Sequence, residues 1–364
     1  MNHLVSVYCI TFNHSAFITD ALDGFCSQDT SFPFVSVIID DASTDGTDKL
    51  IMKYYKDYFE TCNTNLDKEG ESEEYFFAFG RHIVNKNCYF AIYLLKKNHF
   101  QLKKPKWIYL YKWAKQSEFV AICEGDDYWV SREKLQRQVS FMRENVEYSM
   151  TCSRALLFSI REQMLVGENY CYSRSREVSV KDIIYRRGLF ISTCTIVYRK
   201  SVDDEKPEYW SKCAVGDYPL QIACALKGKV WYFDEPMAVY RIDNPASWLG
   251  SKKWYNAGAD PEILRIIKSS IHMFKGFAID YPQYSSLFKT KIAEEINRYV
   301  PTRNNNRQVI KNYLDNFKAE INNYSLYWKI DLLFRKSRFP KMRGLYQLLI
   351  SPRFSSRKKM YKRL

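Results

Sequence analysis

The sequence predicts an α/β fold built on a parallel sheet, and two observations indicate it. Three apolar runs of strand length, residues 4–10, 35–39 and 119–123, each end in a polar loop. The first two loops lead into stretches with apolar residues at helical spacing. Strand and helix in alternation are typical of a parallel sheet, in which ligands bind at the carboxyl ends of the strands.

The first two strand–helix units can be followed residue by residue. The strand at 4–10 runs into a polar loop and then a helix whose apolar face spans residues 17–25. The strand at 35–39 ends in the acidic loop 40–47, which precedes a helix with apolar residues over 50–58. In this loop we expect Ser43 and Asp45 to form turn and helix-cap contacts.

More chain lies between these units and the third strand than a compact sheet needs, so residues from about 61 to 98 are interpreted as an insertion. Its middle, residues 67–74, is a charged loop. The apolar runs at 75–79 and 88–95 are expected to add strands.

The third strand, at 119–123, ends in Gly125, Asp126 and Asp127. Side chains alternate along a strand, so adjacent carboxylates leaving its end point in different directions. One can face a metal ion while its neighbour faces a hydroxyl-rich ligand, and carboxylate oxygens suit Mg²⁺ or Mn²⁺. The alternative is an acidic turn before the next helix, for which Ser131 is the expected N-cap.

The rest of the chain predicts further strands and then helices. Strands are expected near 149–160 and 194–199, and a helix over 214–227 with Gly228 after its end. A strand follows over 229–240, where Pro236 indicates an edge or a bend. From about residue 257 the pattern becomes helical, with one apolar face at the set Val309, Ile310, Tyr313, Leu314 and Phe317.

Composition limits the class of protein. Eleven of the fourteen net positive charges lie in residues 332–364, which contain no acid, so the body of the chain carries only about three. A nucleic-acid-binding protein would interleave basic and aromatic residues over its body instead. The ten cysteines include no Cys-x-x-Cys pair, which disfavours a zinc site and fits a reducing cytoplasm. We expect no signal peptide and no membrane span.

Five short motifs together resemble the family 2 glycosyltransferases, which have the nucleotide-sugar-binding GT-A fold, and most of all the bacterial enzymes of surface-polysaccharide synthesis. The motifs are Val5–Asn13, Val37–Thr47, Ala121–Trp129, Gly216-Asp217 with Ala225–Gly228, and Met237–Arg241. They cover roughly residues 1–250 in the family's order. The resemblance implies a Rossmann-like mixed sheet flanked by helices, followed by a C-terminal helical extension.

The resemblance also implies roles for single residues around the donor. Asp127 would coordinate the metal, Mn²⁺ or Mg²⁺, and Asp126 would lie near the ribose or the donor sugar; which carboxylate touches the metal stays open. Asp41 matches the residue that hydrogen-bonds a uracil-type base. Thr11 and Asn13 match the loop that lines the base pocket.

Three further positions concern the acceptor and the diphosphate. Asp217 matches the catalytic base of the family, and a single base without a second nucleophile implies inversion. Relatives often have His two residues after the Arg that matches Arg241, and this chain has Asp243 there. Asp243 is a candidate metal ligand in its place, although a second carboxylate would repel the diphosphate. Arg241 is expected to pair with phosphate or with an acid.

A nearby basic segment offers another set of cations. Lys103, Lys104 and Lys106 precede the third strand, where they reach the diphosphate or form a solvated basic surface.

The resulting prediction is a GT-A domain over residues 1–255, a helical extension over 256–331 and a basic tail over 332–364. We expect a metal-dependent glycosyltransferase with a nucleoside-diphosphate sugar, UDP-type, as donor and a glycan or lipid-linked acceptor. The protein is expected in the cytoplasm, with the tail on the anionic inner face of the membrane.

Other classes of protein remain alternatives at this point. A sugar nucleotidyltransferase would carry a Gly-rich phosphate loop after the first strand, and residues 11–14 are not one. A catalytically inactive glycan-binding relative would be expected to lack Asp127 or Asp217. A nucleic-acid-binding protein is disfavoured by where the charge lies.

Overall fold

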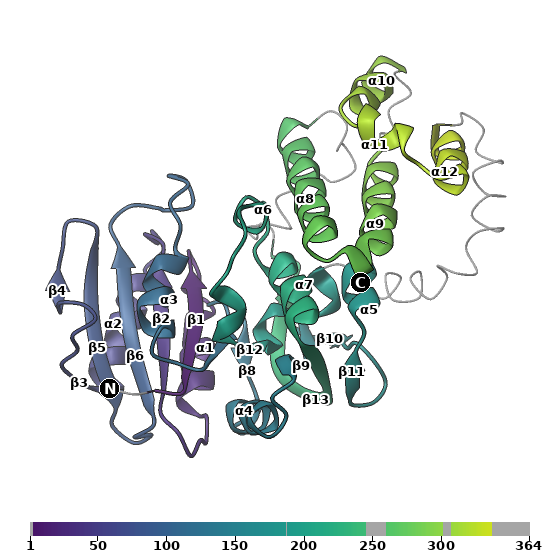
Figure 1. The fold of residues 1–364 in the computed structure, drawn as a ribbon. Helices are drawn as coiled ribbons and strands as arrows, with labels where there is room; N and C mark the ends of the chain where they lie inside the picture. The colour runs from purple at the N-terminus through teal and green to yellow at the C-terminus, as the bar shows by residue number, and fades with distance from the viewer. Residues whose placement is uncertain (1–2, 187, 245–259, 301–306, 337–364) are drawn as a thin grey trace. The chain divides into compact units, whose positions relative to one another are not determined.

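The computed structural model describes residues 3–186, 188–244, 260–300 and 307–336. The chain divides into two compact units, the first made of residues 1–206 and 220–244 and the second of residues 207–219 and 245–364. The predicted fold class is confirmed: a mixed sheet flanked by helices, followed by C-terminal helices (Figure 1).

The first unit holds a sheet whose core is four parallel strands, three of which come from the apolar runs that predicted a parallel sheet. Side by side they run in the order β7-β1-β2-β6, and β2 is buried along its whole length. Their bounds are β1 Val5–Thr11, β2 Phe34–Asp40, β6 Cys88–Leu95 and β7 Phe119–Ile122. Their carboxyl ends point to the top of Figure 1.

Four helices connect these strands or follow them, with bounds α1 Ile18–Cys26, α2 Thr47–Tyr58, α3 Trp107–Ala114 and α4 Lys134–Glu144. Ala21, Leu22 and Phe25 of the predicted apolar face of α1 are buried, together with Ile18 at its start. Figure 1 shows α1 and α3 beside the parallel strands.

The segment expected to add strands does so. It forms a meander at one side of the sheet, with bounds β3 Phe59–Thr61, β4 Gly70–Glu71 and β5 Tyr75–His82, followed by β6. Strand β6 pairs in parallel with β2 from Cys88 to Leu94 and antiparallel with β5. The apolar run at 88–95 is therefore a buried strand within the sheet.

The other side of the sheet is mixed. Its bounds are β9 Tyr148–Ser159, β10 Met164–Asn169, β11 Arg176–Val178, β12 Val197–Arg199 and β13 Lys229–Ile242. Strand β13 runs parallel to β9, and the register shifts on both sides of Pro236, where a bend was expected. Short helices lie between these strands: α5 Val180–Arg186 and the 3₁₀ turns Gly188–Phe190, Thr193–Thr195 and Lys200–Asp203.

The helix after Asp127 begins later than expected. Tyr128 and Trp129 form a short strand, β8 (Tyr128–Trp129), against β13, and α4 starts only at Lys134 without a side-chain cap, so the prediction of Ser131 as N-cap is wrong. A long-range contact outweighs the local signal, because the indole Nε1 of Trp129 donates to the carbonyl of Cys194 at 2.8 Å. Burial lowers the pKa of Lys134, whose Nζ lies 4.5 Å from the centre of the Trp129 ring, to about 7.

The second unit is helical, as the pattern after residue 257 predicted. Its bounds are α6 Glu208–Ser211, α8 Pro261–Asp280, α9 Ser285–Arg298, α10 Arg307–Asp315, α11 Lys318–Asn322 and α12 Leu326–Lys336, with a 3₁₀ turn at Pro282–Tyr284. Helix α7 (Asp217–Lys227) begins in this unit and continues in the first. Tyr313 and Phe317 of the predicted apolar face are buried. Among the described residues, no helix has the length and apolar character needed to cross a membrane.

Candidate functional site

The carboxyl ends of β1, β2, β6 and β7 bring most of the predicted site residues of the first unit together. Thr11 and Asp40 are direct partners at the ends of β1 and β2, and the backbone N–H of Asp41 donates to the carbonyl of Thr11 at 2.9 Å. The backbone N–H of Gly125, after β7, donates to the carbonyl of Ile10 at 2.9 Å. The polar loops predicted from three separate motifs therefore lie at one edge of one sheet.

The loop after β2 is held by its own side chains. Ser43 donates to the carboxylate of Asp40 twice, from its hydroxyl at 2.5 Å and from its backbone N–H at 3.0 Å. Burial raises the pKa of Asp40 to about 6, against the lowering effect of these bonds. Asn13 joins the two loops, because its backbone N–H donates to Ser43 Oγ at 2.9 Å and its Oδ1 accepts from the N–H of Thr44 at 2.8 Å.

Asp45 acts at the start of α2, as expected. Its Oδ1 accepts from the backbone N–H of Thr47 at 3.1 Å, and its Oδ2 accepts from the N–H of Ser15 at 2.9 Å. These bonds lower the pKa of Asp45 to about 2, against a desolvation effect that raises it. The expected turn and cap roles of Ser43 and Asp45 are what the structure has.

The carboxylate of Asp41 is bound by groups of its own chain. It is 1% exposed, and its carboxylate accepts from the backbone N–H groups of His99 at 2.6 Å and Phe100 at 3.2 Å. The ammonium of Lys106 completes the set at 2.7 Å. The residue predicted to hydrogen-bond a base thus fixes the loop between β6 and α3, and Lys106 neutralises it.

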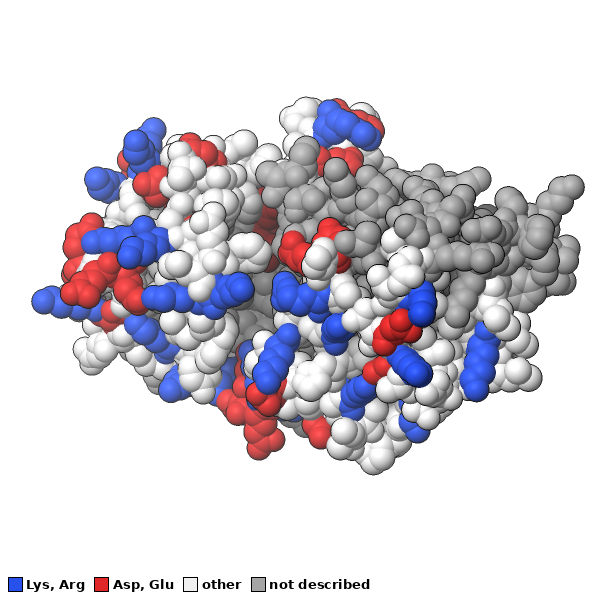
Figure 2. Space-filling view, turned by 90° about the horizontal axis from the view of Figure 1, so that it is seen from above, with Lys and Arg blue, Asp and Glu red and all other residues white. Residues whose placement is uncertain are grey.

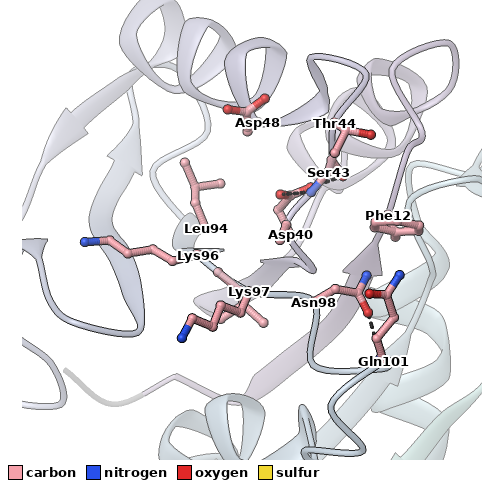
Figure 3. Close-up of a pocket in the computed structure, with 12 residues that line it drawn as sticks. Phe12, Asp40, Ser43, Thr44, Asp48, Leu94, Lys96, Lys97, Asn98 and Gln101 are labelled. Carbon is pink, nitrogen blue, oxygen red and sulfur yellow. Dashed lines mark hydrogen bonds between the residues drawn. The ribbon is translucent and has the colours of Figure 1, made fainter.

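A polar cavity of about 450 Å³ opens beside this loop (Figure 3). It is lined by Phe12, Asp40, Ala42, Ser43, Thr44, Asp48, Leu94, Leu95, Lys96, Lys97, Asn98 and Gln101. Figure 3 shows Asp40 bonded to Ser43 in the middle of the group, with Lys96 and Lys97 on one side and Phe12 on the other. A ring face, amide groups and cations in one recess can hold a flat heterocycle and an anionic group.

The sequence reasoning missed half of this cavity. Lys96, Lys97 and Asn98 follow the end of β6, and the rule that ligands bind where parallel strands end would have found them once 88–95 was placed beside β2. Phe12 also lines the cavity and lies inside the motif Val5–Asn13, which does not single it out. Thr11, predicted to line the base pocket, is instead fully buried, and a Cβ on Gly125 would come within 2.7 Å of its side chain.

Charged side chains around this edge pair with one another. Lys104, a candidate for the diphosphate, is 2.9 Å from Glu74, and Lys96 is 2.7 Å from Glu71. Figure 2, which looks down on this end of the strands, shows Lys and Arg side chains next to Asp and Glu. Lys103 is exposed on the same loop.

The two carboxylates of the acidic turn after β7 differ in burial. Asp127 is 3% exposed, and its Oδ1 accepts the backbone N–H of Arg241 at 2.8 Å. Burial and the nearby charge of Asp126 raise the pKa of Asp127, while the Arg241 bond lowers it. The Asp126 carboxylate is 18% exposed and lies 3.7 Å from Nε2 of His14. Burial lowers the pKa of His14 although Asp126 acts in the opposite direction.

Arg241 binds an acid, one of the two partners expected for it. Its guanidinium pairs with Asp20 of α1 and donates from Nη1 to the carbonyl of Asp126 at 2.7 Å. It lies against aromatic rings, 4.9 Å from the centre of Phe17 and 4.6 Å from that of Tyr128. The side chain is only 6% exposed, so Arg241 ties α1, β13 and the acidic turn together.

The donor atoms at this turn suit a hard divalent cation. Asp126 and Asp127 supply carboxylate oxygens, the ligand type that Mg²⁺ and Mn²⁺ take, and such ions keep several sites for water and phosphate. No group of three or more His, Cys, Asp or Glu side chains that could hold a metal occurs among the described residues. Asp243 adopts a left-handed φ of 63° and accepts from Ser159 Oγ at 2.9 Å.

Asp217 lies in the second unit and is described there by itself. It is the first residue of α7, half-buried, and its Oδ1 accepts the backbone N–H of Tyr218 at 2.8 Å. Desolvation raises the pKa of this carboxyl, and backbone hydrogen bonds partly offset the rise. A carboxyl with a raised pKa at a helix start is a good proton acceptor near neutral pH.

Comparison with known sequences gives relatives without an assigned activity. No family model matches the chain. Uncharacterized proteins of Mycobacterium bovis and Mycobacterium tuberculosis are 28% identical to it over 245 residues, which are 67% of this chain. The chain spans about 60% of the length of these curated relatives.

Comparison with solved structures gives likeness over most of the chain. Residues 1–349 of S. aureus TarS, in complex with UDP, are 18% identical, with a TM-score of 0.43 over 87% of this chain and 90% of that one. A mannosyltransferase from Pyrobaculum calidifontis, in complex with GDP-Man and Mn²⁺, is 13% identical, with a TM-score of 0.47 over 95% of this chain and 83% of that one. Such distant likeness carries no argument about chemistry, which the site's own residues must supply.

Proposed function

We propose that the protein is a glycosyltransferase that takes its sugar from a nucleoside-diphosphate donor, with UDP as the expected nucleotide. The observation that carries the proposal is the placement of two features at one edge of the parallel sheet. The polar cavity lies at the ends of β2 and β6, and the acidic turn follows β7, with β1 between them. A base recess beside a metal-binding carboxylate pair is what a nucleotide-sugar requires, and the five sequence motifs point to the same chemistry.

The cavity is assigned to the nucleoside. The ring of Phe12, 38% exposed, offers a stacking face, and the amides of Asn98 and Gln101 offer donors and acceptors for a base edge. Asn98 is held in place, because its Oδ1 accepts the N–H of Gln101 at 2.8 Å and its Nδ2 donates to the carbonyl of Asp41 at 3.0 Å. Asn13 contributes by fixing the rim, and Asp41 by fixing the 98–106 loop.

The acidic turn is assigned to the diphosphate and its cation. Asp127, with Asp126 beside it, would hold Mn²⁺ or Mg²⁺, and that ion would neutralise the charge of the departing nucleoside diphosphate. Arg241 keeps the turn in place through its bonds to Asp126 and Asp127. His14 lies 3.7 Å from the Asp126 carboxylate, and both side chains are partly exposed.

Asp217 is proposed as the base that accepts the proton of the attacking acceptor hydroxyl, in a single displacement that inverts the anomeric centre. Asp217→Asn keeps the shape and removes the proton acceptor, and should lower turnover by a factor of about 10² to 10⁴. Donor affinity should stay nearly unchanged. Asp315→Asn, at an exposed acid of α10, is the matched control. Loss of donor affinity with intact turnover would move Asp217 to the nucleotide site.

The first experiment is a donor screen. The full-length protein is incubated with UDP- and GDP-sugars in the presence of Mn²⁺ or Mg²⁺, and release of free nucleotide is measured with and without a chelator. Chelator-sensitive release from one donor class is the expected result. No release from any donor, with binding of none, would rule out sugar transfer.

The acceptor is proposed to be a glycan or a lipid-linked glycan of a surface polysaccharide, reached from the cytoplasmic side of the membrane. Support comes from the family resemblance and from the eleven basic residues of segment 332–364, which an anionic membrane attracts. Most of that segment lies outside the described residues. The division into residues 1–255, 256–331 and 332–364 remains part of this proposal; α12 runs on to Lys336.

A further inference from the structure

Helix α12 presents apolar side chains to solvent. Leu326 is 74% exposed, Leu333 64%, Tyr327 43% and Ile330 38%. Residues 326, 330 and 333 follow the helical spacing of four and then three, so they form one stripe along the helix. Removing a Leu or Ile side chain from water stabilises a protein more than most surface contacts do. A surface helix therefore ordinarily turns such a stripe toward the protein interior.

The opposite face of α12 is already used, which fixes the direction of the stripe. Asp331 is buried, and its Oδ2 accepts from Nδ2 of Asn297 on α9 at 2.7 Å. The same amide is 3.2 Å from the carbonyl of Trp328, and Leu332 is buried on this side. Turning the stripe inward would bury Lys329 and expose Asp331, so the arrangement locks the apolar residues outward.

The sequence beside and after the stripe is basic. Lys329 is exposed beside it, and from Arg335 to the end of the chain the sequence has eleven basic residues and no acid. A partner for this region must therefore offer an apolar layer and negative charge together. A bilayer that contains anionic lipid provides both, since acyl chains lie directly beneath charged headgroups.

We propose that α12 docks on an anionic lipid surface, with Leu326, Ile330 and Leu333 inserted at the headgroup boundary. The basic residues that follow supply attraction at a distance, and the stripe supplies the part of the binding that salt does not screen. This proposal does not depend on the proposed sugar transfer. It goes beyond electrostatic attraction of the basic segment 332–364, because it adds the insertion of apolar side chains into the lipid.

The test uses the full-length protein and co-sedimentation with vesicles of phosphatidylcholine, alone or mixed with phosphatidylglycerol. The variant Leu326→Ser/Ile330→Ser/Leu333→Ser should bind mixed vesicles at least about tenfold more weakly than the parent. At about 1 M salt the Debye length is about 3 Å, so electrostatic attraction is largely screened. The parent should then retain part of its vesicle binding, and this variant should not. Ile279→Ser, which removes a 78% exposed isoleucine from α8, is the matched control and should bind like the parent.

Further measurements separate the lipid from other occupants. Leu326→Phe/Leu333→Phe keeps the apolar stripe and should retain vesicle binding. Unchanged vesicle affinity in the serine variant overturns the proposal. If that variant instead loses self-association, the stripe is an interface between two copies, and if only its melting temperature changes, another part of the chain covers it. Donor hydrolysis, measured in parallel, should stay unchanged and shows that the variants are folded.

Discussion

Two pairs of adjacent aspartates end two strands of the same sheet, and the structure uses them differently. After β2, both carboxylates are satisfied by their own chain, Asp40 by Ser43 and Asp41 by two backbone N–H groups and Lys106. After β7, Asp127 is buried and accepts the backbone N–H of Arg241, while Asp126 stays partly exposed beside His14.

The difference separates a scaffold from a reaction centre. A carboxylate that accepts from three groups of its own chain, as Asp41 does, holds a loop but has little left for a ligand. A buried carboxylate with few donors has a raised pKa and gains most from a cation placed against it. The pair after β2 therefore shapes the cavity, and the pair after β7 is the better place for chemistry.

The largest effect is expected on stability at Asp41. Asp41→Ala leaves Lys106 and the N–H groups of His99 and Phe100 without their acceptor in a buried place, so it should lower the free energy of unfolding by about 3–5 kcal/mol. Urea denaturation measures this loss. Glu74→Gln breaks the exposed pair with Lys104 nearby and should lower the free energy of unfolding far less, because solvent screens this pair. Equal losses of stability in both variants would mean that the Asp41 carboxylate does not hold the loop in place.

Next in size is the effect of Asp127 on catalysis. Asp127→Asn keeps an oxygen for the N–H of Arg241 but removes the charge, so the fold should persist while metal-dependent nucleotide release falls by a factor of about 10² to 10³. Asp40→Asn, in the other pair, is the matched comparison and should alter release far less. Full activity of the Asp127 variant, or activity that a chelator leaves unchanged, would remove the metal from the proposal.

A pH dependence distinguishes Asp40. Its pKa is raised to about 6 in the folded protein, against about 3.9 in an unfolded chain, so the folded state binds more protons between these values. The free energy of unfolding should therefore fall as the pH rises from about 4 to about 6, by up to about 3 kcal/mol from this group. Asp40→Asn should remove this part of the slope in urea titrations. If the free energies of unfolding of the variant and the parent changed with pH in the same way, the pKa of Asp40 would not be raised by burial.

The smallest effect is expected at Ala42, which follows the first pair with a left-handed φ of 61°. Alanine is strained there and glycine is not, so Ala42→Gly should leave stability unchanged or raise it by up to about 1 kcal/mol. Ala319→Gly, at an exposed position of α11, should lower it by about 1 kcal/mol. Thermal melts of both variants give the comparison, and a clear loss in Ala42→Gly would contradict the strain.

The residue pattern within a short segment predicted those strands and helices that the segment forms by itself. Apolar runs predicted β1, β2 and β7, and helical spacing predicted α1 and α2. The placement of these ends at one edge followed from the general geometry of parallel sheets.

Long-range partners account for what sequence reasoning missed. The donors to Asp41 are backbone N–H groups 58 and 59 residues away, and any residue type except proline could supply them. Trp129 became part of a strand because its indole meets a carbonyl 65 residues on. The place of β6 beside β2, and with it the cavity wall of Lys97 and Asn98, depends on a strand order that no short motif encodes.

The ion pair between Asp20 and Arg241 joins positions 221 residues apart, and this separation has a consequence for biosynthesis. Chain emerging from a ribosome can pair β1 with β2 early, whereas the guanidinium that compensates Asp20 and holds the acidic turn is translated near the end of the first unit. Contacts so distant in sequence close slowly, because chain entropy is lost before they form. The reaction centre should thus be the last part of its unit to mature, and nascent chains that stop before β13 should carry the sheet's parallel core without a competent acidic turn.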